Sequence, residues 1–189
     1  GTLDEWALVA AWLNDLPHRY KVIVAGNHDR CFVEHREQAL AKLDPSVIYL
    51  EDNGVTLEGL RFWGSPWQPA YNDWAFNLPR GSALANQWAL IPSHTDILIT
   101  HGPPRGIGDR GPTDGRAGCA DLRTAIRRIS PKVHLFGHIH QDGGLWCEES
   151  TIFLNVTTWE SERPPTVFDI QPHPFRLHPV QIPPPHANE

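Results

Sequence analysis

Hydrophobic and polar positions change from a helical period to a strand period within the first 25 residues. Thr2 and Glu5 have the spacing of a helix capping box, and apolar residues then recur three or four positions apart up to Leu13. We therefore expect a helix over about residues 3–15, ended by Pro17. Residues 21–25 are a short, largely apolar run that leads into Gly26, which predicts a buried strand followed by a turn.

The middle of the chain predicts a second helix and several short strands. The helix is expected near residues 34–43, and β-branched and aromatic segments at 47–50, 55–57 and 60–63 predict an antiparallel run. Residues 64–81 are rich in Trp, Pro, Gly and Asn, which is typical of an ordered loop. A short helix is expected near residues 82–90.

Strands and one further helix alternate in the second half. Residues 96–100 predict a strand that ends at His101, and residues 119–129 predict a helix with one apolar stripe. Further strands are expected at 133–136, 151–156 and 166–170. The pattern predicts an α/β domain over residues 1–170, and the Pro- and His-rich segment 171–189 is expected to be an extended or poorly ordered tail.

Composition narrows the classes of function. The 189 residues are 40% hydrophobic, which is enough for one domain with a core. A formal net charge of -6 argues against a nucleic-acid polymer as partner. No apolar run is long enough to cross a bilayer, the N-terminus lacks the pattern of a secretory signal, and the three cysteines form no disulfide framework. We therefore expect a cytoplasmic protein without a membrane partner.

Three polar clusters share one context, because each directly follows a predicted strand. They are Gly-Asn-His-Asp at 26–29, His-Gly-Pro-Pro at 101–104 and Gly-His-Ile-His at 137–140. The carboxyl ends of strands in α/β folds converge on a crevice, and imidazole and amide groups are ligands for transition metals. The alternative is that these residues only close turns.

In this order and spacing, the clusters resemble the third, fourth and fifth motifs of the calcineurin-like metallophosphoesterase superfamily. Residues 64–69, 76–81, 101–110 and 118–119 also resemble its small branch of metallophosphoesterase-domain proteins known for cyclic-nucleotide phosphodiesterase activity. The resemblance covers residues 1–170. It implies an α/β fold, a two-sheet αββα sandwich, here lacking its first strands.

The resemblance also implies a role for each cluster. By motif position, Asn27, His101 and His138 resemble ligands of the second metal, and His140 resembles a ligand of the first. His28 resembles the histidine that protonates the leaving group. An intact family member holds two divalent ions (Mn, Fe or Zn), which activate a water against a phosphoester substrate.

Three arginines and three tryptophans have two interpretations each. Arg105, Arg110 and Arg116 flank the clusters and could bind the substrate phosphate, although solvated loop arginines are common. Trp63, Trp67 and Trp74 are close in sequence, and core packing is favoured over a base-stacking platform.

The sequence departs from the superfamily at its start, where the Asp-x-His and Gly-Asp motifs are absent. His140 is then the one candidate ligand of the first metal, so one ion or none is expected in this chain. Two functions follow: a metal-dependent phosphodiesterase, acting for example on cyclic nucleotides through a metal-activated water, or a catalytically silent relative or fragment that acts as a binding or scaffold protein. Missing strands would expose a sheet edge, which predicts a homodimer.

Overall fold

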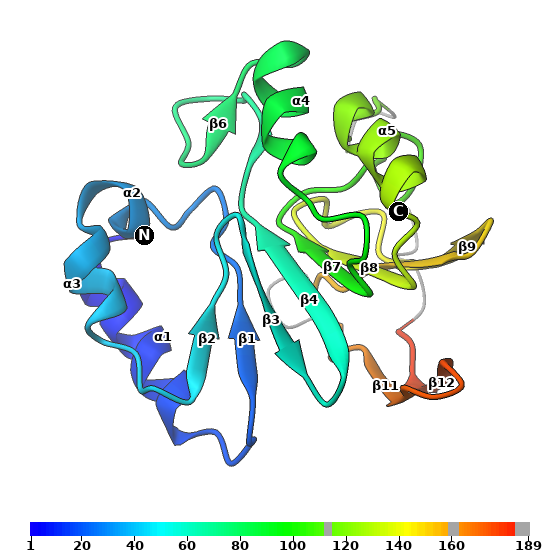
Figure 1. The fold of residues 1–189 in the computed structure, drawn as a ribbon. Coiled ribbons are helices and arrows are strands. Elements are labelled where there is room, and N and C mark those ends of the chain that lie inside the picture. The colour runs from blue at the N-terminus through cyan, green and yellow to red at the C-terminus, as the bar shows by residue number, and fades with distance from the viewer. Residues whose placement is uncertain (112–114, 159–162, 184–189) are drawn as a thin grey trace.

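Two β-sheets lie between two groups of helices in the computed structural model, which describes residues 1–111, 115–158 and 163–183 (Figure 1). Helices α1–α3 lie outside the smaller sheet, and α4 and α5 cover the larger sheet on the other side (Figure 1). The predicted α/β sandwich is confirmed. No helix among the described residues is long and apolar enough to cross a membrane.

The N-terminal part forms the smaller sheet and its helices. Helix α1 (Leu3–Asp15) begins with the predicted capping box, in which Thr2 Oγ1 accepts from the Glu5 backbone and Glu5 accepts from the Thr2 backbone. The other elements are β1 (Lys21–Ile23), α2 (Cys31–Glu34), α3 (Arg36–Leu40) and β2 (Val47–Tyr49).

Two expectations for this region need correction. The helix expected near 34–43 is two short helices, because His35 leaves the helical region with φ −139°. Of the antiparallel run expected over 47–63, the segments at 55–57 and 60–63 are indeed antiparallel, but the segment at 47–50 is not part of it. Strand β2 pairs in parallel with β1, because the chain between them crosses over through α2 and α3.

The larger sheet has six strands in the order β3-β4-β7-β8-β10-β9. They are β3 (Asn53–Leu57), β4 (Leu60–Ser65), β7 (Ile97–Thr100), β8 (Val133–Phe136), β10 (Thr151–Asn155) and β9 (Gly144–Glu148). The four inner strands are parallel, and the two edge strands are antiparallel to their neighbours. Strand β9 was not predicted.

Helices α4 (Ser82–Ala89) and α5 (Ala120–Ile129) cover one face of the larger sheet. Their buried side chains, among them Trp88 and Leu122, share a core cluster with Leu98 and Phe136 of β7 and β8. This packing holds the parallel strands in place, so that the loops at their carboxyl ends have a fixed scaffold.

The two sheets are in close contact at Gly64. A Cβ at this position would lie 2.3 Å from Leu50 Cβ and 2.8 Å from Val24 Cγ2. Only a residue without a side chain fits such a distance. The close approach brings the chain that leaves β1 next to the ends of β4 and β7.

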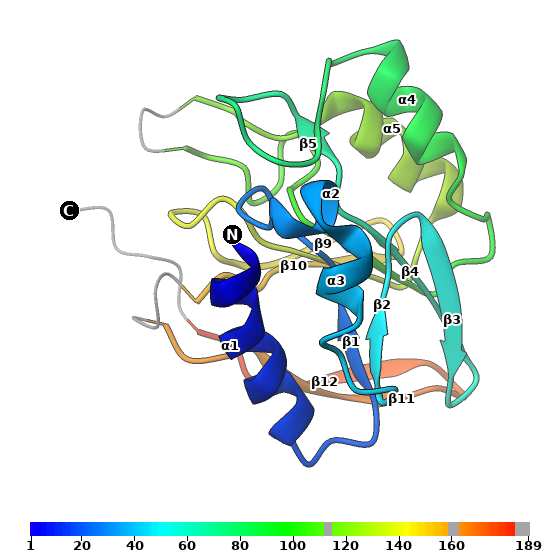
Figure 2. The same cartoon turned by 90° about the vertical axis from the view of Figure 1, so that its left-hand side faces the viewer.

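The C-terminal segment is a β-hairpin, which corrects the expected extended tail. Strands β11 (Val167–Gln171) and β12 (Arg176–Gln181) are antiparallel. Apolar residues of the hairpin and its turn, including Phe168, Phe175 and Leu177, pack against the face of the larger sheet that α4 and α5 leave open. Figure 2 shows the hairpin at the end of the molecule opposite α4 and α5. Residues 184–189 of the predicted tail lie outside the described residues.

Candidate metal-binding site

Three of the predicted ligands meet where strands β1, β7 and β8 end. Asn27 follows β1, His101 follows β7 directly, and His138 lies two residues after β8. Strands β7 and β8 are parallel neighbours, and the Gly137 amide donates to the His101 carbonyl at 2.9 Å. The parallel pairing therefore brings together side chains that are far apart in sequence.

The donor atoms of these three residues form a small triangle. Asn27 Oδ1 lies 2.5 Å from His101 Nε2 and 3.1 Å from His138 Nδ1, and the two imidazole nitrogens are 3.0 Å apart. Ligands bound to one ion at right angles, with bonds of about 2.1 Å, are about 3.0 Å apart. The two edges that end at His138 match this spacing, and the edge between Asn27 and His101 is shorter, so the three donors are close enough together to bind one ion.

Burial keeps the two histidines of the triangle neutral. It lowers the pKa of His101 to about 3, with the nearby His138 adding to the effect, and it lowers the pKa of His138 to about 4. Each neutral imidazole has one N–H and one lone pair, and Asn27 Oδ1 has lone pairs alone. A divalent transition ion fits this donor set of two nitrogens and one oxygen.

The backbone at His138 is strained. Its φ of +69° lies in the left-handed region, which a non-glycine residue rarely adopts. The surrounding loop holds it there, since the Ile139 amide donates to the Gly137 carbonyl at 2.8 Å. Such strain is concentrated at functional sites, where the fold imposes the direction of a side chain.

Asn155 holds the Gly-His-Ile-His loop through hydrogen bonds to its backbone carbonyls. This side chain, at the end of β10, is 1% exposed, and its Nδ2 donates to the carbonyls of Ile139, Asp142 and Gly108 at 2.8, 3.0 and 3.2 Å. Sequence analysis missed this residue. The available signal was a lone Asn at the end of an otherwise apolar strand.

A second buried link joins β7 to β8. Thr100 Oγ1 donates to the Gly102 carbonyl at 2.7 Å, so it accepts the bond from His134 Nε2 at 2.8 Å. His134 is fully buried, and burial lowers its pKa to about 3, so the ring is neutral and its proton lies on Nε2. The Thr100 link fixes the turn that follows His101.

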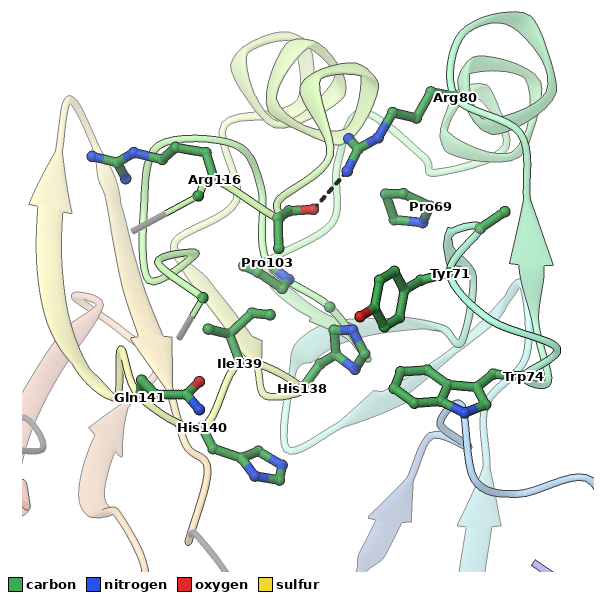
Figure 3. A pocket seen from close by; sticks show the side chains of 15 residues that line it. Pro69, Tyr71, Trp74, Arg80, Pro103, Arg116, His138, Ile139, His140 and Gln141 are labelled. Carbon is green, nitrogen blue, oxygen red and sulfur yellow. Dashed lines mark hydrogen bonds between the residues drawn. The ribbon is translucent and has the colours of Figure 1, made fainter. Parts of the chain in front are cut away.

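The other two predicted histidines lie beside the triangle. His28 is exposed, and its ring centroid lies 5.1 Å from that of Trp74. His140 lines the cleft next to His138 (Figure 3). Neither imidazole is one of the three triangle donors. Among the described residues, no group of three His, Cys, Asp or Glu side chains is placed to hold a metal. The triangle is not such a group, because its third donor is the amide of Asn27.

A cleft of about 570 Å³ opens beside the triangle. Arg80 and Arg116 line it, whereas Arg105 and Arg110 are exposed and lie outside its lining (Figure 3). The Arg80 guanidinium donates to the carbonyls of Ala117 and Gly118, both at 2.8 Å. Arg116 was one of the candidate arginines from the sequence, whereas Arg80 was not, although it lies in the quoted segment 76–81.

Arg116 forms an ion pair with Asp109 at 2.6 Å. The Asp109 side chain is fully buried, and it also accepts from the backbone amides of Gly106 and Gly118. This carboxylate ties together the loop that carries Arg116, so it holds one wall of the cleft in place.

The buried thiol of Cys119 belongs to the core. It accepts hydrogen bonds from Trp88 Nε1 and the Leu122 amide, both at 3.4 Å, and burial raises its pKa. A raised pKa leaves less of the nucleophilic thiolate near neutral pH. Core packing is therefore favoured over a nucleophilic role for Cys119.

A two-sheet sandwich with Asn and His donors at the ends of parallel strands defines the class of metal-dependent phosphoesterases. The family described as calcineurin-like phosphoesterase matches residues 2–142, and the chain belongs to this family. Its members are hydrolases that use divalent metals and act on phosphoesters.

Relatives agree with this assignment. The chain is 41% identical over 187 residues to the human metallophosphoesterase domain-containing protein 1, covering 84% of this chain and 57% of that protein. It is 37% identical to the UPF0046 protein T07D4.2 of Caenorhabditis elegans, covering 86% and 49% respectively. The chain thus spans about half the length of the curated relatives that it matches.

A solved structure shows the same fold. The structure of the protein TT1561 of Thermus thermophilus superimposes with a TM-score of 0.63 at 15% identity. The match covers 96% of this chain and 81% of that one. At this identity the likeness concerns the fold alone.

Proposed function

We propose that this chain contributes the site of a metal-dependent phosphoesterase that hydrolyses small-molecule phosphodiesters. The observation that carries the proposal is the triangle of Asn27, His101 and His138 donor atoms, with edges of 2.5–3.1 Å, beside an open cleft. Cyclic nucleotides, which the resemblance of segments such as 64–69 implies, are the diesters we would assay first.

Asn27, His101 and His138 would hold one divalent ion, and manganese, iron and zinc suit their donors. When bound, such an ion lowers the pKa of a water and offsets negative charge on the phosphoryl oxygens. Burial of both histidines keeps their lone pairs available, because protonation would require a pH near 3 or 4. His140, which lines the cleft beside His138, would contribute to the other ion, the first metal of the family motifs.

His28 would act as the proton donor. It is exposed at the rim of the site, and imidazole is the side chain that exchanges protons near neutral pH. As a water oxygen bonds to phosphorus and the P–O bond to the leaving group breaks, the leaving ester oxygen would take the His28 proton. Arg80 and Arg116, which line the cleft, would attract the negatively charged diester.

The alternative function is a silent binding protein that keeps the fold and one ion. It predicts that the triangle binds a divalent ion without turnover. A homodimer and a cytoplasmic location stay predictions.

Metal affinity and turnover measured together test the proposal. We would titrate the metal-free chain with Mn²⁺ by calorimetry and follow Mn²⁺-dependent hydrolysis of bis(p-nitrophenyl) phosphate. The His138→Ala variant should weaken Mn²⁺ binding at least tenfold and lower kcat/KM at least a hundredfold. His94→Ala is the matched control, since His94 is exposed and precedes β7, at the opposite end of that strand from His101.

Turnover by the unaltered chain that persists in excess chelator, or that His138→Ala leaves unchanged, would overturn the phosphoesterase proposal. Mn²⁺ binding that depends on His138, without turnover of any diester, would favour the silent binding protein.

A further inference from the structure

Two aromatic side chains line the cleft beside the candidate metal site. Tyr71 and Trp74 line the cleft from the loop between β5 (Gln68–Pro69) and β6 (Asn77–Leu78), as Figure 3 shows. Their ring centroids are 5.3 Å apart, and the Trp74 centroid lies 6.1 Å from that of His138. Trp74 thus lies directly beside one of the triangle residues.

Core packing does not account for this pair. Trp67 and Trp63 pack against the buried clusters, whereas Trp74 and Tyr71 belong to none of the clusters among the described residues. The Tyr71 side chain is 63% exposed. Open aromatic surface in a cleft favours a ligand that covers it.

The loop that carries the pair is held rigidly. The Asn77 side chain donates to the carbonyls of Asn72 and Tyr71 at 2.9 and 3.2 Å, and it accepts from buried Gln68 at 3.0 Å. Backbone bonds from Gln68 to Phe76 and from Ala70 to Leu78 close the loop. The aromatic pair is therefore preorganised, which lowers the entropic cost of binding.

The rest of the cleft completes a slot for a flat group. Pro103 and Ile139 provide apolar surface in the same cleft, and the volume of about 570 Å³ lies within the range of small-ligand sites, about 300–1,000 Å³. A phosphorus atom beside the triangle would leave one ester substituent next to Tyr71 and Trp74. A planar aromatic substituent would bind the Tyr71 and Trp74 rings by offset or edge-to-face stacking.

We propose that Tyr71 and Trp74 form an aromatic subsite that selects phosphoesters with a planar, apolar ester group. The inference rests on the proposed function for the position of the phosphorus atom. Tyr71 and Trp74 determine specificity through the substituent and take no part in bond breaking.

Two substrates with the same leaving group test the subsite. We would compare p-nitrophenyl phenyl phosphate with p-nitrophenyl methyl phosphate, each with Mn²⁺, in the unaltered chain and in Tyr71→Ala. The ratio of kcat/KM for the phenyl ester to that for the methyl ester should fall at least fivefold in Tyr71→Ala, mainly through KM. Comparing ratios cancels the intrinsic difference in reactivity between the esters.

Matched variants separate stacking from other effects. Tyr71→Phe keeps the ring and should keep the ratio within twofold. Tyr20→Ala removes a tyrosine that bonds to Glu58 and does not line the cleft, so it should leave both esters unchanged.

A binding experiment keeps the two proposals apart. Calorimetry with phenyl phosphate and methyl phosphate measures the subsite without turnover. Phenyl phosphate that binds at least fivefold more tightly, with a preference that Tyr71→Ala abolishes, supports the subsite even if neither ester is hydrolysed. An equal loss for both esters in Tyr71→Ala, or equal binding of the two phosphates to the unaltered chain, would overturn the subsite while leaving hydrolysis itself unaffected.

Discussion

Replacing Thr100 by valine tests the buried link between β7 and β8. Valine has the shape of threonine, but it removes the hydroxyl that accepts from His134 Nε2 and donates to the Gly102 carbonyl. Thr100 is 2% exposed, so water does not readily replace the lost bonds. Both remaining polar groups would be buried without this partner.

The magnitude follows from these two groups. A buried polar group without a partner costs about 1–3 kcal/mol, so Thr100→Val should lower the free energy of unfolding by about 3 kcal/mol. Thr100→Ser keeps the hydroxyl and loses one methyl group, which costs about 1 kcal/mol. The difference between the two variants isolates the hydrogen bonds from the packing.

Urea unfolding followed by circular dichroism measures this difference. With a slope of about 2 kcal/mol per molar urea, the valine variant should unfold about 1.5 M earlier than the unaltered chain. Mn²⁺ titration should also show weaker binding, because Gly102 directly follows the predicted ligand His101. Thr100→Ser should keep most of the Mn²⁺ affinity.

A double-mutant cycle with His134→Leu tests whether the Thr100 hydroxyl acts through His134. If the hydroxyl acts through His134, Thr100→Val should cost at least about 1 kcal/mol less in the His134→Leu background. A valine variant as stable as the serine variant, or a cycle without coupling, would show that the link contributes nothing.

Three further perturbations follow from the same structure. Unfolded histidines gain a proton below about pH 6.5, whereas His101, His134 and His138 stay neutral in the folded chain down to pKa values of about 3, 3 and 4. The unfolded chain then binds more protons than the folded chain, so the free energy of unfolding should fall as the pH drops from about 6.5 to 4. The expected fall is about 1.4 kcal/mol per pH unit for each histidine. Equal urea midpoints at pH 7 and pH 5 would contradict this. Gly64→Ala should destabilise the chain by about 3 kcal/mol or more, because its Cβ would collide with Leu50 at 2.3 Å, whereas Gly102→Ala, with its nearest contact at 3.8 Å, should be tolerated in thermal unfolding. Arg116→Ala should cost about 3 kcal/mol, because it leaves the fully buried Asp109 carboxylate without its cation, while loss of the exposed Arg127 should cost under about 0.5 kcal/mol by the same urea assay.

Local patterns in the sequence were enough for much of the scaffold. The capping box at Thr2 and Glu5, the apolar stripe of α5 and the strand at 133–136 each depend on residues within a few positions of one another. For the same reason, the position of the polar clusters at strand ends could be predicted, since each cluster follows its own strand directly.

Pairing between distant segments could not be predicted in this way. Phe168, Ile170, Phe175 and Leu177 of the hairpin pack against the open face of the larger sheet, which is far from them in sequence. Proline and histidine dominate the composition there and suggested an extended tail. Likewise, β2 pairs with β1 because of the crossover through α2 and α3, which sequence spacing alone did not show.

The sequence by itself determined that this is an α/β chain with Asn and His residues at the ends of its strands, because helix and strand periods, and the residues that follow each strand, are local properties. Only the tertiary structure decided which atoms meet. It brought Asn27, His101 and His138 to within about 3 Å of one another, placed Arg80 and Arg116 in the cleft, and put Asn155 beneath the loop. The physical reason is that these contacts depend on sheet order and packing between segments dozens of residues apart, which no local pattern contains.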